Sequence, residues 1–280
     1  MMTATAPAKL NLTLEVLNKR PDGFHEIRSV VQTITFGDKL KISAGPRLEI
    51  KCNRPEWSAA KSLVSKAVSL LKNSTGTSQG AIIEIEKRIP VSSGLGGDSS
   101  DAAAVLRGLN MLWNLRLSLR DLISYAAQLG ADVPLFLYGG TVLIEGKGEK
   151  IRPLHPMPHM TVVLFMPSIP TVENKTQKMY GQLSVRNYTP GRTTEDFTNM
   201  LEGKASKPGI GLFNVFDEVA LKFFNGLKEA KQKFIEAGAT EVHLAGSGPT
   251  LFTLTRDDLK ADDIHQRLQR MKLEAYLADF

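Results

Sequence analysis

The stretch Pro90-Val91-Ser92-Ser93-Gly94-Leu95-Gly96-Gly97-Asp98-Ser99-Ser100-Asp101 decides how this chain is interpreted. It follows an alternating apolar run, 81–86, that predicts a strand, and it precedes an apolar run, 102–112, that predicts a helix. Glycines permit a sharp turn and let main-chain N–H groups approach an anion, while the helix start adds unpaired N–H donors. The stretch therefore predicts a phosphate-binding loop in a protein that handles a nucleoside triphosphate.

This loop differs from the two common glycine-rich phosphate loops. A Walker loop has a lysine directly after its last glycine, whereas Asp98 follows Gly97 here and the loop contains no lysine. A dinucleotide-binding loop has the spacing G-x-G-x-x-G, and Ser99 stands where its third glycine would be. The cation that a triphosphate requires must then come from another part of the chain. A plain strand-to-helix turn is the alternative interpretation.

The composition is typical of a soluble globular protein. Its 280 residues suit two ordinary domains or one large one, with 42% apolar and 23% charged residues. The net charge of +6 favours anionic small molecules, and the basic residues are scattered, so we expect no nucleic-acid partner. Cys52 is the only cysteine, the N-terminus does not resemble a signal peptide, and no apolar run is long enough to cross a bilayer. These features predict a cytoplasmic protein with no membrane partner.

The pattern of apolar residues predicts an α+β fold with strands concentrated in the first hundred residues. We expect an early strand over 9–16 and a short apolar strand after Pro134, and we expect the proline cluster 153–158 to be a linker. The other predicted strands are 27–36, 39–43, 47–51, 161–166, 241–244, 250–255 and 274–278. The predicted helices are 58–72, 102–113, 119–129, 197–201, 215–237 and 257–271.

Four further patches carry polar residues in unusual places. A lysine within an apolar strand, Lys9, must reach solvent or find an anion. Phe24 and His25 follow a turn and are suited to clamping a flat ring. Asp132 follows a predicted helix end, where the helix dipole disfavours a carboxylate unless a cation meets it. The fourth patch is a second glycine turn, Gly246-Ser247-Gly248-Pro249-Thr250. Each patch taken alone also has an ordinary structural interpretation.

Taken together and in this order, the patches resemble the GHMP superfamily of small-molecule kinases, which includes galactokinase, homoserine kinase and mevalonate kinase. Within it the closest resemblance is to the branch that acts on 4-diphosphocytidyl-2-C-methyl-D-erythritol in the non-mevalonate pathway to isoprenoids. The resemblance implies an N-terminal domain like domain 2 of ribosomal protein S5 and a ferredoxin-like C-terminal domain. We place these domains at residues 1–155 and 156–280, with the ATP-binding loop in the first.

The resemblance also implies roles for individual residues. Pro90 to Ser100 matches the ATP-binding loop of the family, and the Gly246-Ser247-Gly248 turn matches the motif that packs near the phosphates. Lys9 matches the lysine near the transferred phosphate, and Asp132 matches the aspartate that acts on the substrate hydroxyl as a base. The expected cofactors are ATP and Mg²⁺, with Ser99 or Ser100 within reach of the ion by analogy and no metal site built from protein ligands alone.

The same resemblance implies a cytosine-binding site. Asn11 matches a substrate-contacting asparagine, and Phe24 and His25 match the pair that grips the base, with Tyr180 as the nearest candidate for a further aromatic. Phe24 replaces the usual tyrosine, which keeps stacking but loses a hydroxyl. Asp98 replaces a glycine, and we expect it to turn outward or to bond its own turn rather than to hold Mg²⁺. We expect a monomer or weak homodimer.

Two alternatives remain open from the sequence. One is a sister kinase of the superfamily that acts on mevalonate, homoserine or a sugar, although such a substrate has no base for Phe24 and His25 to grip. The other is a nucleotide- or RNA-binding module without catalysis, which the presence of both Lys9 and Asp132 disfavours.

Overall fold

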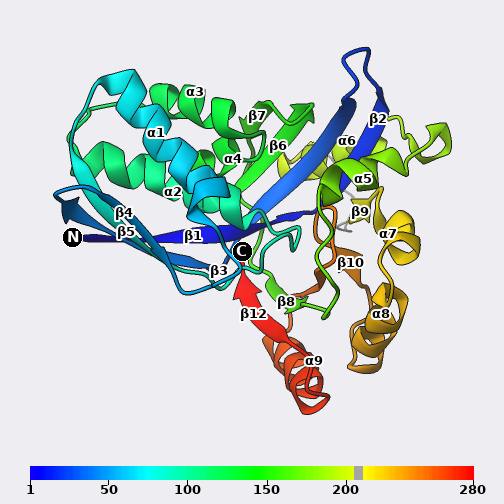
Figure 1. The fold of residues 1–280 in the computed structure, drawn as a ribbon. Coiled ribbons are helices and arrows are strands. Elements are labelled where there is room, and N and C mark those ends of the chain that lie inside the picture. Colours follow the sequence, from blue (N-terminus) through cyan, green and yellow to red (C-terminus); the bar gives the residue numbers. More distant parts are fainter. Residues whose placement is uncertain (205–210) are drawn as a thin grey trace. The chain divides into compact units, whose positions relative to one another are not determined.

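The computed structural model describes residues 1–204 and 211–280 (Figure 1). The chain divides into two compact units, and neither is a single continuous segment. The first unit comprises Met1–Ala8, Gly37–Val91 and Gly96–Gly139, and the second comprises Lys9–Phe36, Ser92–Leu95 and Gly140–Phe280. The glycine-rich stretch is therefore shared, with its centre, Ser92–Leu95, in the second unit.

The first unit combines a helical layer with strands. The second half of β3 (His25–Gly45) pairs antiparallel with β5 (Gly80–Glu86), which pairs parallel with β4 (Leu48–Cys52). In Figure 1 the α-helices of this unit lie together on one side of β4 and β5. The helices are η1 (Ala59–Lys61), α1 (Leu63–Thr75), α2 (Gly97–Leu112), α3 (Leu119–Leu129) and α4 (Val133–Tyr138).

The second unit contains two groups of strands. In the first group, the first half of β3 pairs antiparallel with β2 and β6, β6 pairs with β7, and β2 pairs parallel with β9. In the second group the strand order is β10-β11-β8-β12, all antiparallel. β1 (Met2–Asn11) begins in the first unit and ends in the second. The remaining strands are β2 (Thr13–Lys19), β6 (Thr141–Gly146), β7 (Lys150–Pro153), β8 (Thr161–Phe165), β9 (Phe213–Asn214), β10 (His243–Leu244), β11 (Leu251–Thr255) and β12 (Ala275–Asp279).

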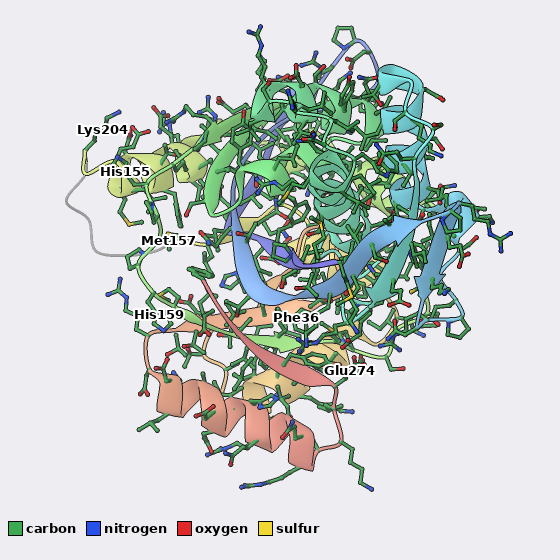
Figure 2. The ribbon with its side chains drawn as sticks, turned by 90° about the vertical axis from the view of Figure 1, so that its left-hand side faces the viewer. Phe36, His155, Met157, His159, Lys204 and Glu274 are labelled. Carbon is green, nitrogen blue, oxygen red and sulfur yellow. The ribbon has the colours of Figure 1, made fainter. Side chains whose placement is uncertain are left out.

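The core of the second unit lies between the strands and their helices. Apolar side chains of β2, β8 and β11 pack with those of the helices, and Phe165 and Phe234 meet edge to face with ring centroids 5.7 Å apart. Phe36, labelled in Figure 2, places its ring 4.7 Å from that of Tyr276 in β12. The helices of this unit are α5 (Lys175–Gly181), η2 (Val185–Asn187), α6 (Arg192–Leu201), α7 (Asp217–Phe223), α8 (Leu227–Glu236) and α9 (Asp258–Arg270).

The predicted linker, residues 153–158, lies between β7 and β8 and is held in place by burial and a hydrogen bond. Figure 2 labels His155, Met157 and His159 along it. Met157 is buried, and its N–H donates to Thr141 Oγ1 at 3.2 Å. The predicted domain boundary after residue 155 stays a prediction. Each compact unit consists of three separate segments, so the units do not correspond to one boundary along the chain.

Several predicted elements are confirmed. Helix α3 has the predicted bounds, and Ser118 and Asp121 form the capping box that their spacing indicated. The strand predicted at 161–166 is β8, and the mixed helix and strand content confirms the α+β class. Within the described ranges, no helix is long and apolar enough to span a membrane.

The predicted breaks in the N-terminal strands are wrong in two places. Gly37 and Asp38 do not end a strand but lie inside β3. A Cβ on Gly37 would lie 2.4 Å from the carbonyl oxygen of Ala6, so glycine is required here by close approach of β1 and not by a turn. The predicted strand 9–16 is instead split between β1 and β2 at Leu12.

Two helix assignments also need correction. The apolar run after Pro134 is helix α4 and not a strand. Five consecutive residues, 133–137, are buried, so the run has no periodicity that separates a helix from a strand. The helix predicted over 215–237 is two helices, α7 and α8, with Gly226 at φ 85° between them. Helix α5 was not predicted at all.

Candidate active site

Lys9 and Asn11 form a buried polar group at the end of β1. Their side chains are 6% and 9% exposed, and Lys9 Nζ donates to Asn11 Oδ1 at 2.6 Å. Asn11 Nδ2 donates to Ser29 Oγ at 2.8 Å, which fixes the orientation of the amide. The lysine that the sequence singled out is therefore held inside the second unit and does not snorkel to solvent.

Two glycine turns meet beside this lysine. A Cβ on Gly94 would lie 2.1 Å from the carbonyl oxygen of Ala245, and a Cβ on Gly246 would lie 2.9 Å from Lys9 Nζ. The N–H of Thr250 donates to the Ser93 carbonyl at 3.3 Å, and the N–H of Lys9 donates to the Leu95 carbonyl at 3.0 Å. The centre of the predicted ATP loop, the Gly246 turn and Lys9 are thus brought together in one place, as the sequence predicted.

Lys175 adds a second buried cation to this place. It is the first residue of α5, is 7% exposed, and donates from Nζ to the carbonyls of Ser92, at 2.8 Å, and of Gly248. Burial, helped by the nearby charge of Lys9, lowers the pKa of Lys175 to about 7. Two neighbouring buried ammonium groups repel each other, so an anion bound between these turns is favoured.

An aromatic cluster surrounds His25 in the second unit. The rings of His25 and Tyr180 stack with centroids 5.1 Å apart and planes at 26°, and Tyr188 meets His25 edge-on at 6.1 Å. Tyr180 in turn packs at 88° against Phe216. Burial, with a smaller effect from Lys19, lowers the pKa of His25, which favours the neutral ring at pH 7. Stacking faces and a neutral imidazole suit a nucleobase.

Phe24 is placed differently from its predicted partner. Its side chain is 57% exposed, and Lys147 Nζ lies 4.9 Å from the centre of its ring. Within the described ranges, no ring pair includes Phe24. The structure therefore joins His25 with Tyr180 and not with Phe24.

The end of the glycine-rich stretch forms the first turn of α2 in the first unit. Gly96 is the N-cap residue of α2 and has the left-handed conformation. The first N–H groups of a helix have no acceptor within the helix. The Ser100 hydroxyl is buried, and in the described structure it has no hydrogen-bond partner. This half of the stretch carries the N–H donors and the hydroxyls that the sequence predicted.

Asp98 does not behave as expected. Instead of turning outward or bonding its own turn, it accepts a hydrogen bond at Oδ2 from the N–H of Leu63, 3.0 Å away. Leu63 is the first residue of α1, so the carboxylate caps another helix. The acidic residue in the loop thus has a structural partner within the first unit.

A buried ion-pair cluster lies under the start of the loop in the first unit. Lys87 Nζ donates to Asp38 Oδ2 at 2.6 Å and to Asp101 Oδ2 at 2.8 Å. Asp38 Oδ1 accepts from the N–H groups of Arg88, at 2.6 Å, and Ile89, at 2.7 Å. The cluster therefore fixes the main chain that leads into Pro90.

Asp132 lies at the boundary between α3 and α4 in the first unit. It is half-buried and is the N-cap residue of α4, without a side-chain capping bond. The sequence placed it past the end of a helix, where the dipole is unfavourable. The structure places it at a helix start, which favours a carboxylate.

Comparison with known proteins shows the family. The family model "GHMP kinases N terminal domain" matches residues 62–140, and "GHMP kinases C terminal" matches residues 198–272. A 4-diphosphocytidyl-2-C-methyl-D-erythritol kinase of Dehalococcoides mccartyi is 43% identical over 278 residues, covering 99% of this chain and 97% of the relative. The chain belongs to the GHMP kinase family. It is therefore an enzyme of the kinase class.

Other relatives and solved structures support the assignment to the GHMP kinases. A protein of the same name from Geobacillus sp. is 38% identical over 273 residues, covering 94% of this chain and 91% of the relative. A crystal structure of 4-(cytidine 5'-diphospho)-2C-methyl-D-erythritol kinase superposes with a TM-score of 0.83 at 30% identity, covering 99% of this chain and 98% of the other. Homoserine kinase from Cytophaga hutchinsonii has a TM-score of 0.74 at 18% identity, covering 99% and 93% of the two chains, and shares the fold.

Sequence reasoning about this GHMP kinase missed Lys175 and Lys87. The alternation of β5 held a signal for Lys87, because Ile83 and Ile85 are buried and Lys87 follows them on the same face. No local pattern marks Lys175, since its burial depends on two turns that are distant in the sequence.

Proposed function

We propose that this GHMP kinase transfers the γ-phosphate of ATP to the 2-hydroxyl of 4-diphosphocytidyl-2-C-methyl-D-erythritol. The products are the 2-phosphate and ADP, in the non-mevalonate route to isoprenoid precursors. The observation that carries the proposal is the meeting of Lys9 with the Gly94 and Gly246 turns inside one unit. The names of the relatives that match nearly the whole chain support the acceptor.

In this proposal each group has one task. The N–H groups of Gly94 to Ser100 and of the Gly246 turn hold the phosphates, and Lys9 offsets the negative charge that develops on the transferred group. Asp132 orients the substrate hydroxyl and accepts its proton. Asn11 contacts the substrate, and His25 and Tyr180 bind the cytosine ring. Phe24 stays a candidate for the rim of this site.

Mg²⁺ fits the residues present as a companion of the triphosphate. Mg²⁺ in nucleotide enzymes is held by phosphate oxygens and one or two protein oxygens, with waters in the remaining positions. The unpartnered hydroxyl of Ser100 at the start of α2 is the side chain that would complete its shell. Among the described residues no group of three or more His, Cys, Asp or Glu side chains is arranged to hold a metal. When bound, the ion supplies positive charge to the phosphate oxygens.

The base-binding cluster favours this acceptor over those of sister kinases. Mevalonate, homoserine and sugars have no flat ring, so they leave the stacked His25 and Tyr180 without a ligand. Because these two rings are in contact, a cytosine that enters between them must displace one of them.

The test is incubation of the purified protein with ATP, Mg²⁺ and the cytidyl substrate, followed by phosphorus NMR. We expect a new phosphate monoester, with one molecule of ADP formed for each molecule of the monoester. Turnover of mevalonate, homoserine or galactose in the same assay, with none of the cytidyl substrate, replaces this proposal by a sister activity. No ATP turnover with any acceptor, together with RNA binding that weakens steeply with salt, supports a binding module instead.

Replacement of Asp132 by Asn tests the assignment of the base. The change keeps the shape of the side chain and removes its basicity, so kcat is expected to fall by about 10²–10⁴-fold. The KM for ATP should stay within about threefold, since only transition-state help is lost. Steady-state kinetics measures both constants, and a kcat near the wild-type value removes Asp132 from the chemistry.

The proposal includes a cytoplasmic enzyme that acts as a monomer or weak homodimer, with no membrane and no nucleic acid as partner. Light scattering after size-exclusion chromatography measures the state directly. A stable larger assembly would correct this part without affecting the chemistry.

A further inference from the structure

Lys175 joins two parts of the site that are far apart in the sequence. Its Nζ donates to the carbonyl of Ser92, at 2.8 Å, and to the carbonyl of Gly248. Ser92 belongs to the glycine-rich stretch, and Gly248 belongs to the second glycine turn. The neighbouring Thr176 hydroxyl lies 3.3 Å from that of Ser247, so the start of α5 contacts the second turn twice.

In the described structure, the partners of Lys175 Nζ are main-chain carbonyls. In the described structure no carboxylate forms an ion pair with Nζ, and the turn segments 92–95 and 245–250 have no ionisable side chain. The charged group that acts on it is Lys9, and the charged residues on its own segment, Glu173 and Lys178, are exposed. A buried ammonium with only carbonyl partners is incompletely neutralised.

We propose that Lys175 is a positioning residue for nucleotide binding, whose side chain ties the Ser92 and Gly248 carbonyls together and thereby sets the shape of the phosphate-binding turns. The inference rests on the proposed function, since it takes the bound anion to be the nucleotide phosphates. Lys175 acts through main-chain carbonyls, so its loss disturbs the turns and not the transfer step.

A pH dependence follows from the same geometry. The pKa of Lys175 in the free enzyme is lowered to about 7 by burial and by Lys9. Phosphate charge beside the turns favours the protonated amine and raises this pKa in the complex. Nucleotide binding above pH 7 is therefore accompanied by proton uptake, and affinity falls as the pH rises through and above about 7.

The first experiment compares Lys175→Met with Lys178→Met in the full-length enzyme. Lys178 lies on the same helix but is exposed, so its variant is the matched control. Loss of two hydrogen bonds from a charged donor is expected to raise the KM for ATP by about 10- to 100-fold in Lys175→Met. The kcat at saturating ATP and the KM for the cytidyl substrate should stay within about threefold, and the control should match wild type. An unchanged KM for ATP overturns the proposal.

The second measurement separates positioning from a merely structural role. The Kd for MgADP is titrated calorimetrically from pH 6.5 to 8.5. The affinity of wild type and of Lys178→Met for MgADP should fall by up to about tenfold per pH unit above pH 7, as expected when one proton is taken up per nucleotide. Lys175→Met should show no such slope. A folded Lys175→Met enzyme that keeps the wild-type slope contradicts the inference.

A third variant protects the test against misfolding. Lys175→Arg keeps a permanent charge, so it should bind MgADP with a flat pH profile and recover part of the ATP affinity. If both variants fold but bind MgADP as wild type does at every pH, Lys175 has no role in nucleotide binding. If wild type shows the pH slope but phosphorylates no cytidyl substrate, the proposed function fails while the inference about Lys175 stands.

Discussion

Lys87 in the first unit and Lys175 in the second are both buried, yet their partners differ in kind. Lys87 donates to the carboxylates of Asp38 and Asp101, and Lys175 donates to two main-chain carbonyls. Burial lowers the pKa of both amines, but the two carboxylates outweigh it at Lys87 and raise that pKa above its usual value. Lys87 is therefore charged at every physiological pH, whereas Lys175 titrates near neutrality.

This difference separates a structural charge from a charge available to a ligand. Asp38 and Asp101 are the partners of Lys87 within the fold; burial raises the pKa of Asp101, and the nearby charge of Asp38 raises it further. At Lys175, whose Nζ donates to two main-chain carbonyls in the described structure, an anionic ligand gains additional attraction. In the proposed function, the cation missing from the glycine-rich stretch is Lys9 of β1.

The largest effect on stability is expected from Lys87→Met. Removing the shared cation leaves two buried acids, Asp38 and Asp101, without the partner that they share, which should lower the free energy of unfolding by about 3–5 kcal/mol. Urea unfolding measures the change, with Lys39→Met on the exposed face of β3 as a control expected within about 0.5 kcal/mol. If Lys87→Met is as stable as wild type but loses ATP affinity, the distinction between the two lysines is wrong.

Lys9→Met should show the opposite behaviour. Loss of the charge beside the transferred phosphate is expected to reduce kcat by about 10²–10³-fold. The free energy of unfolding should fall by less than about 2 kcal/mol, because the hydrogen bond from Lys9 Nζ to the Asn11 amide oxygen joins a cation to a neutral group and not to buried carboxylates. Kinetics and urea unfolding on the same preparation measure kcat and the free energy of unfolding. A large loss of stability with a normal kcat would show that Lys9, like Lys87, has a structural role.

His25→Ala tests whether the second unit holds two separable subsites. The change removes the ring that stacks on Tyr180, so the KM for the cytidyl substrate should rise by about tenfold or more. The KM for ATP should stay within about twofold, because the lysines and turns are intact. Equal increases in both constants argue against a role in base binding.

Asp98→Ala is expected to have the smallest effect. It removes the acceptor for the Leu63 N–H at the start of α1 and should cost about 1 kcal/mol of stability. The KM for ATP should not rise, since a negative charge near the loop is lost. Thermal unfolding and ATP kinetics measure the two effects, and a large increase in KM would show that Asp98 serves the nucleotide directly.

Much of the site was predictable because local chemistry marks it. The glycines of 94–97, the lysine within an apolar strand and the turn before His25 are unusual in a linear pattern, and the resemblance to the GHMP kinases rests on their order. The pairing of His25 with Tyr180, and not with Phe24, was only partly predicted. Adjacent residues of an extended chain point in opposite directions, so sequence neighbours seldom share one cluster.

Local sequence patterns were sufficient to predict the α+β class, the bounds of α3, the strand β8 and the residues proposed for a phosphate site, because turns, caps and periodicity act over a few residues. The tertiary structure alone decided that β3 passes unbroken through Gly37, that Asp98 caps α1 and that Lys175 reaches two glycine turns. Each of these depends on an approach between segments tens of residues apart. The charge state of a lysine depends on its burial and on its partners, and both are established only when those segments pack together.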